Sequence, residues 1–212
     1  MKSLKLCFES LLDGDDVFFD SGNEKKLVKE WINDNYKING NLTISDDFVV
    51  NCAGHVTVKN KSITSLTNGL FSWGEVDGFF NCGRCDKLTS LEGAPKKVGG
   101  DFCCHECNSL ETLEGAPEEV GGNFYCSCCE KLISLEGAPK KVGAGLYCNG
   151  CINLKSLKGA PKKVGYAFDC SQCGNLTTIK DGPEKVGSLF YCIRCPKLTI
   201  TDSDRKKYKI VR

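Results

Sequence analysis

Paired cysteines are the residues best suited to chemistry in this chain of 212 residues, which contains 16 cysteines. Six C-x-x-C pairs recur every 22 residues, at Cys82/Cys85, Cys104/Cys107, Cys126/Cys129, Cys148/Cys151, Cys170/Cys173 and Cys192/Cys195. Two such pairs could supply four sulfurs to one zinc ion, and paired thiols are also typical of redox chemistry. A metal-binding or redox-responsive protein is therefore one hypothesis for this chain.

Apolar residues share the period of the cysteines. Valine recurs from Val76 to Val186, phenylalanine or leucine from Phe80 to Phe190, and leucine from Leu88 to Leu198. Zinc ribbons need no such apolar framework, and buried cysteine packs as a small hydrophobic residue. We therefore expect reduced thiols in a narrow core, with no metal or cofactor. Zinc and disulfides stay as alternatives, because neighbouring repeats stacked about 4.8 Å apart would allow both.

The repeat can be written V-x-x-x-F-x-C-x-x-C-x-x-L-x-x-L-x-G-A-P-x-x. Its F-x-C segment alternates like a short strand, while Gly and Pro in the return path exclude a long helix or a second long strand. One repeat cannot enclose its own apolar side chains, but stacked repeats can. The period of 22 and the spacing of leucines resemble leucine-rich repeats, although one leucine comes a residue late. The sequence thus predicts a mostly β fold, a right-handed parallel β-solenoid of leucine-rich-repeat type.

The phrase Ser90-Leu91-Glu92-Gly93-Ala94-Pro95 returns nearly unchanged at Thr112, Ser134 and Ser156, and in altered form at Thr178. These repeats resemble those of phage and prophage leucine-rich-repeat proteins, whose units read LTSLEGAPKKVGGDFYCSNC. The resemblance covers about residues 36–198. It implies a solenoid fold and a viral or mobile-element setting, without a defined activity.

The flanking segments predict caps for the solenoid. Residues 1–40 form an N-terminal cap with an amphipathic helix containing Leu27, Val28, Trp31 and Ile32. Residues 41–80 are degenerate first repeats, in which the run from Val50 to His55 echoes F-x-C-x-x-C. Regular repeats follow over 81–198, and 199–212 form a C-terminal cap.

Composition argues against several classes of partner. The net charge is +1, which gives no general reason to expect nucleic acid, and no stretch is long enough to span a membrane. The apolar run within residues 1–9 is too short for a signal peptide, so we expect a cytoplasmic protein, in the host cytoplasm if it is viral. With two histidines, His55 and His105, no catalytic set can be assembled, so we do not expect an enzyme.

Function is expected on the outward side of the F-x-C strands, where residues vary between repeats while core positions barely change. The expected partner-binding residues are Arg84, His105, Tyr125, Tyr147, Asn149, Asp169, Tyr191 and Arg194. The favoured hypothesis is a module that binds a host protein, for instance to counter a bacterial defence system. A structural or assembly component of a virion is the remaining alternative.

Overall fold

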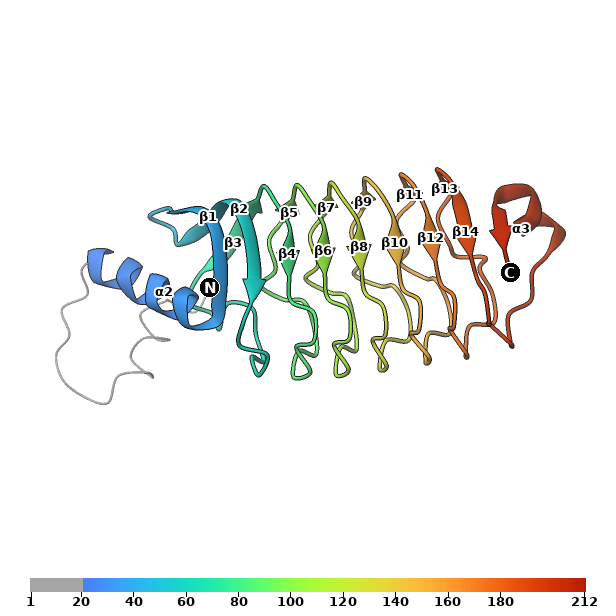
Figure 1. Cartoon of the computed structure of the whole chain (residues 1–212), viewed down its shortest axis with the longest axis horizontal. Helices are drawn as coiled ribbons and strands as arrows, with labels where there is room; N and C mark the ends of the chain where they lie inside the picture. The colour runs from blue at the N-terminus through green and yellow to red at the C-terminus, as the bar shows by residue number, and fades with distance from the viewer. Residues whose placement is uncertain (1–20) are drawn as a thin grey trace.

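The computed structural model describes residues 21–212, which form a parallel β-solenoid with short strands and two small helices (Figure 1). The predicted solenoid fold is confirmed. Residues 1–20, including the segment expected not to be a signal peptide, lie outside the described residues. Within residues 21–212, neither helix has the length and apolar character needed to cross a membrane.

Each regular repeat, called a rung here, contributes one short strand to a ladder of parallel strands, and most of these strands begin with phenylalanine. We call this the Phe ladder, and its strands pair in parallel so that each Phe lies over the next. Leu146 takes the same position in one rung. The strands are β4 (Phe80–Asn81), β6 (Phe102–Cys103), β8 (Phe124–Tyr125), β10 (Leu146–Tyr147), β12 (Phe168–Asp169) and β14 (Leu189–Tyr191).

A second ladder of equally short strands, the Val ladder, was not predicted from the sequence. Its strands place an exposed charged residue before a valine that is buried in every rung but the last, where Val186 is half-buried. They are β5 (Lys97–Val98), β7 (Glu119–Val120), β9 (Lys141–Val142), β11 (Lys163–Val164) and β13 (Lys185–Val186), preceded by β3 (Ser72–Val76). Each rung therefore has two hydrogen-bonded sides, which fix its orientation against its neighbours.

The N-terminal cap consists of α2 (Ser21–Asn35) and an antiparallel hairpin of β1 (Tyr36–Ile44) and β2 (Val49–Val58). The expected division between residues 40 and 41 falls within β1, so the cap continues through the hairpin. Strand β2 serves both ladders, pairing with β3 through its first half and with β4 through its second. Val28 and Ile32 of α2 are fully buried, as expected for an amphipathic helix.

One expectation about the first repeats is wrong in its register. The run beginning at Val50 was expected to match F-x-C, but Val50 lies beside Trp73 on the Val-ladder side. Val56 instead takes the phenylalanine position, since it pairs with Phe80. The register could not be read from the sequence, because buried and exposed residues alternate along most of this ten-residue strand and several of its residues could take the phenylalanine position.

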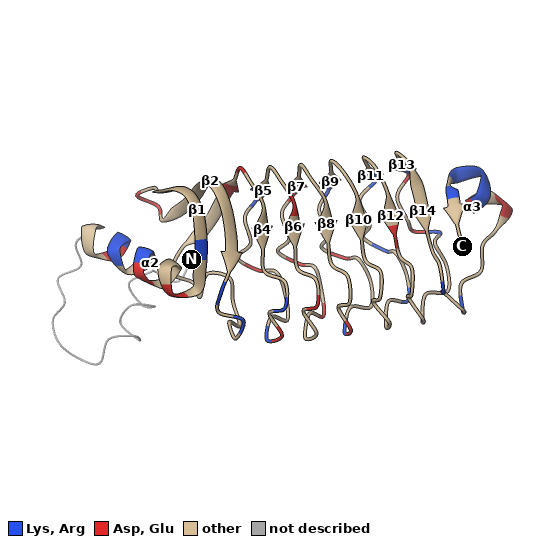
Figure 2. Ribbon diagram, viewed as in Figure 1, with Lys and Arg blue, Asp and Glu red and all other residues tan. Residues whose placement is uncertain are grey.

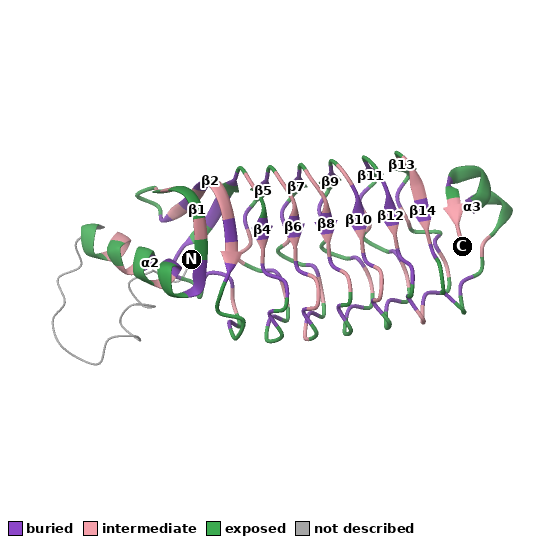
Figure 3. Ribbon diagram, viewed as in Figure 1, coloured by how far each residue is buried: buried purple, intermediate pink, exposed green. Residues whose placement is uncertain are grey.

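The core is a set of columns in which like side chains stack along the solenoid. The rings of Phe80, Phe102 and Phe124 stack with centroids 5.6 and 5.5 Å apart, and Phe168 and Phe190 follow at 4.9 Å. The leucine and cysteine columns beside them are buried (Figure 3). Because every rung encloses the apolar atoms of the next, the ends must be covered.

The C-terminal cap covers the last rung. Helix α3 (Asp202–Lys207) begins with a capping box in which Thr201 and Asp204 bond each other's backbone amides. Tyr208 then stacks on Phe190 at 4.6 Å, and its hydroxyl donates to the carbonyl of Pro183. Strand β15 (Lys209–Val211) pairs with β14 and ends the Phe ladder.

Candidate binding face and cysteine ladder

The outward side of the Phe ladder, called the strand face here, has its central row between the inward Phe and the first Cys of each rung. This row contains Asn81, Cys103, Tyr125, Tyr147, Asp169 and Tyr191, all half-buried. Strand pairing brings these residues side by side in consecutive rungs. The structure therefore places Tyr125, Tyr147, Asp169 and Tyr191, which were predicted at the same outward position of successive repeats, in one continuous row.

Two tyrosines of this row form a stack on the surface. The rings of Tyr125 and Tyr147 lie 4.9 Å apart at 14° to each other. Tyr147 also lies across Gly145, where a Cβ atom would come within 2.7 Å of the tyrosine oxygen. Burial, together with the neighbouring Tyr166 and Asp169, raises the pKa of Tyr147. The rings are thus held in place while part of each stays open to solvent.

A second row of the strand face follows the first Cys of each rung and contains His105 and Asn149. His105 packs beside Gly83 of the preceding rung. The Ser127 hydroxyl donates to Oδ1 of Asn149 over 2.7 Å. These contacts between rungs keep the polar side chains in fixed positions next to the tyrosine row.

A third row lies at the turn between the two cysteines of each rung, and its backbone is left-handed throughout. Positive φ angles between 55° and 74° occur at Arg84, Glu106, Cys128, Gly150, Gln172 and Arg194. Left-handed conformations cost a non-glycine residue roughly 1–2 kcal/mol. Gly150 is the one glycine in this row, so the sequence offers little indication of a positive φ, and the left-handed conformation was not predicted.

The two arginines expected in the binding set lie in this third row, at opposite ends of the solenoid. The Arg84 guanidinium donates two hydrogen bonds, of 3.2 and 3.3 Å, to the carboxylate of Glu106. Arg194 lies one rung before the C-terminal cap. Both arginines therefore flank the tyrosine row and do not lie within it.

The first cysteine of each C-x-x-C pair is buried, and the second cysteine of every pair after Cys82/Cys85 forms a hydrogen bond to the preceding rung. Cys107, Cys129, Cys151, Cys173 and Cys195 donate from Sγ to the carbonyl of the first cysteine of the preceding rung, over 3.1–3.3 Å. We call this series the thiol ladder. It supports the backbone at the left-handed turn, where strand pairing ends.

These thiols are held in the protonated state. Burial raises the pKa of Cys85 to about 12 and that of Cys107 to about 11, and it raises the pKa of Cys104 well above the usual value. A protonated thiol is a poor nucleophile and a poor metal ligand. Burial therefore works against the redox and metal chemistry that the C-x-x-C spacing suggested.

The cysteine side chains also lack the grouping of a metal site in the part of the chain that is described. Among residues 21–212, no three His, Cys, Asp or Glu side chains are arranged to hold a metal ion. All 15 described cysteines are free thiols; Cys128 is exposed and Cys103 half-buried. No disulfide bond therefore joins any of the described cysteines.

Serine substitutions should separate the two cysteine positions. In Cys151→Ser the new hydroxyl can still donate to the Cys126 carbonyl, so we expect a loss of about 1 kcal/mol in the free energy of unfolding. In Cys126→Ser the hydroxyl faces the apolar core, and burying an unpaired hydroxyl costs about 2–3 kcal/mol. Urea denaturation of both variants measures this difference. Equal losses would show that the thiol ladder contributes nothing at the second position.

Charged residues lie beside the Val ladder and also along the loops at the opposite edge (Figure 2). Beside the Val ladder, lysines and glutamates pair between rungs. Lys140 and Glu118 are 3.1 Å apart, and Lys141 and Glu119 are 3.6 Å apart. Exposed pairs of this kind add little stability. Their mixed signs and their exposure are typical of a solvated edge.

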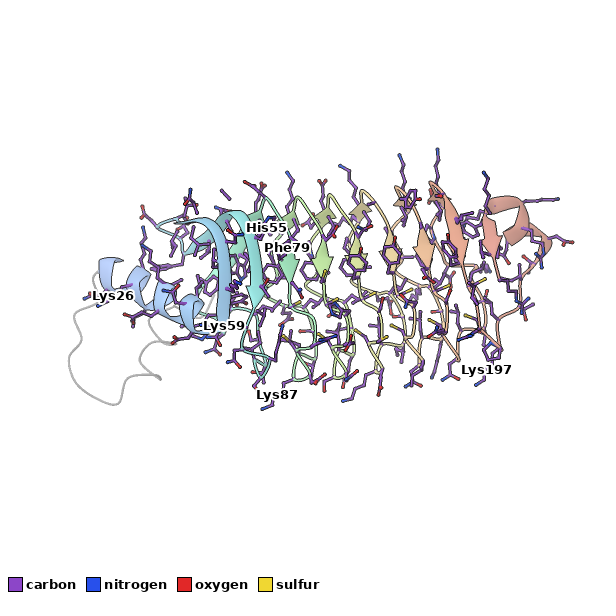
Figure 4. The ribbon with its side chains drawn as sticks, viewed as in Figure 1. Lys26, His55, Lys59, Phe79, Lys87 and Lys197 are labelled. Atoms are coloured by element: carbon purple, nitrogen blue, oxygen red, sulfur yellow. The ribbon has the colours of Figure 1, made fainter. Side chains whose placement is uncertain are left out.

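Two aromatic residues near the strand face were missed in the sequence. Phe79 stacks on His55 with ring centroids 4.3 Å apart, and its amide donates to Nδ1 of His55 (Figure 4). Tyr166 is 59% exposed, more than Phe79 at 37%. Both precede the repeating F-x-C segment, where the repeat pattern gives no signal.

Comparisons with protein-family models, with curated proteins and with solved structures find no match to this chain. The geometry of the strand face and of the cysteines therefore carries the functional argument.

Proposed function

We propose that this chain is a non-catalytic module that binds another protein through its strand face. The observation that carries the proposal is the contrast within each rung. Buried positions keep the same residue types from rung to rung, whereas the central outward row changes from Asn to Cys, Tyr, Asp and Tyr. A uniform frame with a varied surface is expected where the surface has to match one partner.

The stacked pair Tyr125 and Tyr147 supports this choice of face. Tyrosine offers a large contact area and a hydroxyl group at a low entropy cost, and it is enriched at the centres of protein interfaces. Here the stack already fixes the two rings, so a partner would lose little entropy by contacting them. The Val ladder, with its exposed paired lysines and glutamates, is the poorer candidate because such residues are depleted at interfaces.

The setting follows from the resemblance of the repeat to phage and prophage repeats. We propose a phage or mobile-element gene whose product acts on a protein of the host bacterium, with interference in a defence system as the working model. A role as a component of the virion is the alternative, and it would be recognised by the chain's presence in purified particles.

The double variant Tyr125→Ala/Tyr147→Ala should lose partner capture while the fold stays intact. Central interface tyrosines each contribute about 2 kcal/mol or more, so the two together should weaken binding at least about 100-fold. Affinity capture from host-cell lysate, quantified by mass spectrometry against the unaltered chain, measures the loss.

A matched control is Lys141→Ala/Lys163→Ala, which removes two exposed side chains from the Val ladder. It should capture the same protein as the unaltered chain. Loss of capture in the lysine variant, with retention in the tyrosine variant, would move the binding surface to the Val ladder and refute the proposal.

A further inference from the structure

One acidic residue, Asp169, interrupts the row of tyrosines on the strand face. Asp169 pairs with Tyr147 on one side and with Tyr191 on the other. Two rungs separate these tyrosines, a distance of about 10 Å along the solenoid. Asp169 therefore lies between two tyrosines in the row, and its backbone is one rung, about 5 Å, from the backbone of each.

The carboxylate of Asp169 is only partly used by the protein. Its Oδ1 accepts the amide of Ser171 over 2.8 Å, which fixes the side chain on the surface. No lysine or arginine between residues 21 and 212 forms an ion pair with it. An ionised group with a fixed orientation and no cationic partner is suited to accept one from another molecule.

Asp101 on the same face provides a contrast. Its Oδ1 accepts both the amide and the side-chain nitrogen of Asn123, over 2.7 and 3.1 Å. This carboxylate links two rungs and is not framed by two tyrosines. Asp101 is thus a structural acid on the strand face, and Asp169 is the acid without such a structural link between rungs.

The charge beside the tyrosines is negative, and the cations Arg194, in the third row, and Lys209, on β15 beside β14, lie at the C-terminal end of the face. Between Asp101 and Ile193, the central row and the second row contain no lysine or arginine, and Asp101 and Asp169 are the acids beside the tyrosines. A positive partner group at Asp169 would be attracted by the two carboxylates, whereas a negative group would be repelled by them.

We propose that Tyr147, Asp169 and Tyr191 bind an arginine side chain of the partner; this inference rests on the proposed function of the strand face. The guanidinium would pair with the free oxygen of Asp169 and lie within about 6 Å of both ring centroids, the range of cation–π attraction. Arginine is preferred over lysine because its planar group stacks on aromatic rings and bonds a carboxylate through two N–H groups.

The test uses two short extended peptides that differ only in charge: acetyl-Thr-Val-Arg-Val-Thr-amide and the same peptide with neutral citrulline in place of arginine. Each is titrated into the full chain and followed by NMR. We expect the arginine peptide to shift the signals of Tyr147, Asp169 and Tyr191 and to bind about tenfold more tightly than the citrulline peptide. Asp169→Asn, which keeps an oxygen for the Ser171 amide, should abolish this preference. The matched control Asp101→Asn should retain it.

Equal binding of the two peptides, or an unchanged preference in Asp169→Asn, would overturn the arginine site. Failure of both peptides to shift any strand-face signal would overturn it as well. Neither result would decide the proposed function, because the capture experiment with Tyr125→Ala/Tyr147→Ala uses the natural partner and no peptide. The arginine site and the proposed binding function can therefore be refuted independently of each other.

Discussion

The protein is expected to unfold cooperatively as the pH rises from about 9 to 10.5. The cause is the column of buried thiols. In the unfolded chain a thiol has a pKa of about 8.5, whereas burial raises the pKa of Cys151 and Cys173 to about 12. The folded state therefore keeps protons that the unfolded state loses.

The direction follows from the raised pKa values. The thiol contribution to the free energy of unfolding is complete below pH 8.5 and is lost as the pH rises towards 12. Each buried thiol removes up to about 1.4 kcal/mol per pH unit in this window. Several thiols titrating together would exhaust a total stability of about 5–15 kcal/mol within one or two pH units.

Circular dichroism during a pH titration, with a reducing agent present, measures this transition. The control Cys128→Ser removes the exposed thiol and should leave the midpoint unchanged. Replacing Cys126 and Cys148 with alanine lowers the stability at pH 7 but should make the alkaline loss less steep. A free energy of unfolding that stays constant from pH 8 to 10.5 would contradict the account of the thiol column.

Gly165→Ala should destabilise the solenoid by about 3 kcal/mol or more. A Cβ atom at this position would lie 1.8 Å from the carbonyl oxygen of Gly143 in the preceding rung, and Gly143 has the same relation to Gly121 at 2.1 Å. The obstacle is backbone that is itself hydrogen-bonded between rungs, so it cannot move aside without breaking the ladder. Overpacking against such a backbone costs 1–3 kcal/mol and occasionally more.

Gly174→Ala is the matched control, because the nearest atom to its Cβ would be the Ile152 carbonyl oxygen at 4.0 Å. It should be neutral or slightly stabilising, since alanine restricts the unfolded chain more than glycine does. Urea denaturation compares the two variants. Similar stabilities would mean that the rungs can separate by several tenths of an ångström, and the tight stacking would then be wrong.

The period of 22 residues predicted the parallel stacking and the buried columns because both depend on side-chain type alone. Val98, Phe102, Cys104 and Leu110 are all buried. The Val ladder was missed because a strand such as Lys97–Val98 has a single buried residue, whereas the F-x-C segment has two inward residues that make alternation visible. Its hydrogen bonds come from the neighbouring rungs, so they appear only when the rungs are stacked.

The left-handed turn was missed for a different reason. Residues such as Arg84 and Cys128 carry no intrinsic preference for a positive φ, and the rung imposes it on them. The hairpin of the N-terminal cap was missed because the even alternation of Val49–Val58 fits more than one register. In each case, tertiary contacts decide what the local sequence leaves open.

For the candidate site, the sequence predicted which residues face outward but not how they combine. The stacking of Tyr125 on Tyr147 follows from their positions one period apart. The different roles of Asp101 and Asp169 depend on side-chain hydrogen bonds to Asn123 and Ser171, which no spacing rule contains.

The central claim is that the strand face, and not the Val ladder, contacts the partner. Photo-crosslinking in host cells tests it most directly, with p-benzoylphenylalanine introduced at Asn149 on the strand face or at Lys163 on the Val ladder. The account predicts one dominant crosslinked protein from position 149 and none from position 163. Crosslinks to a single protein from position 163 alone would contradict it.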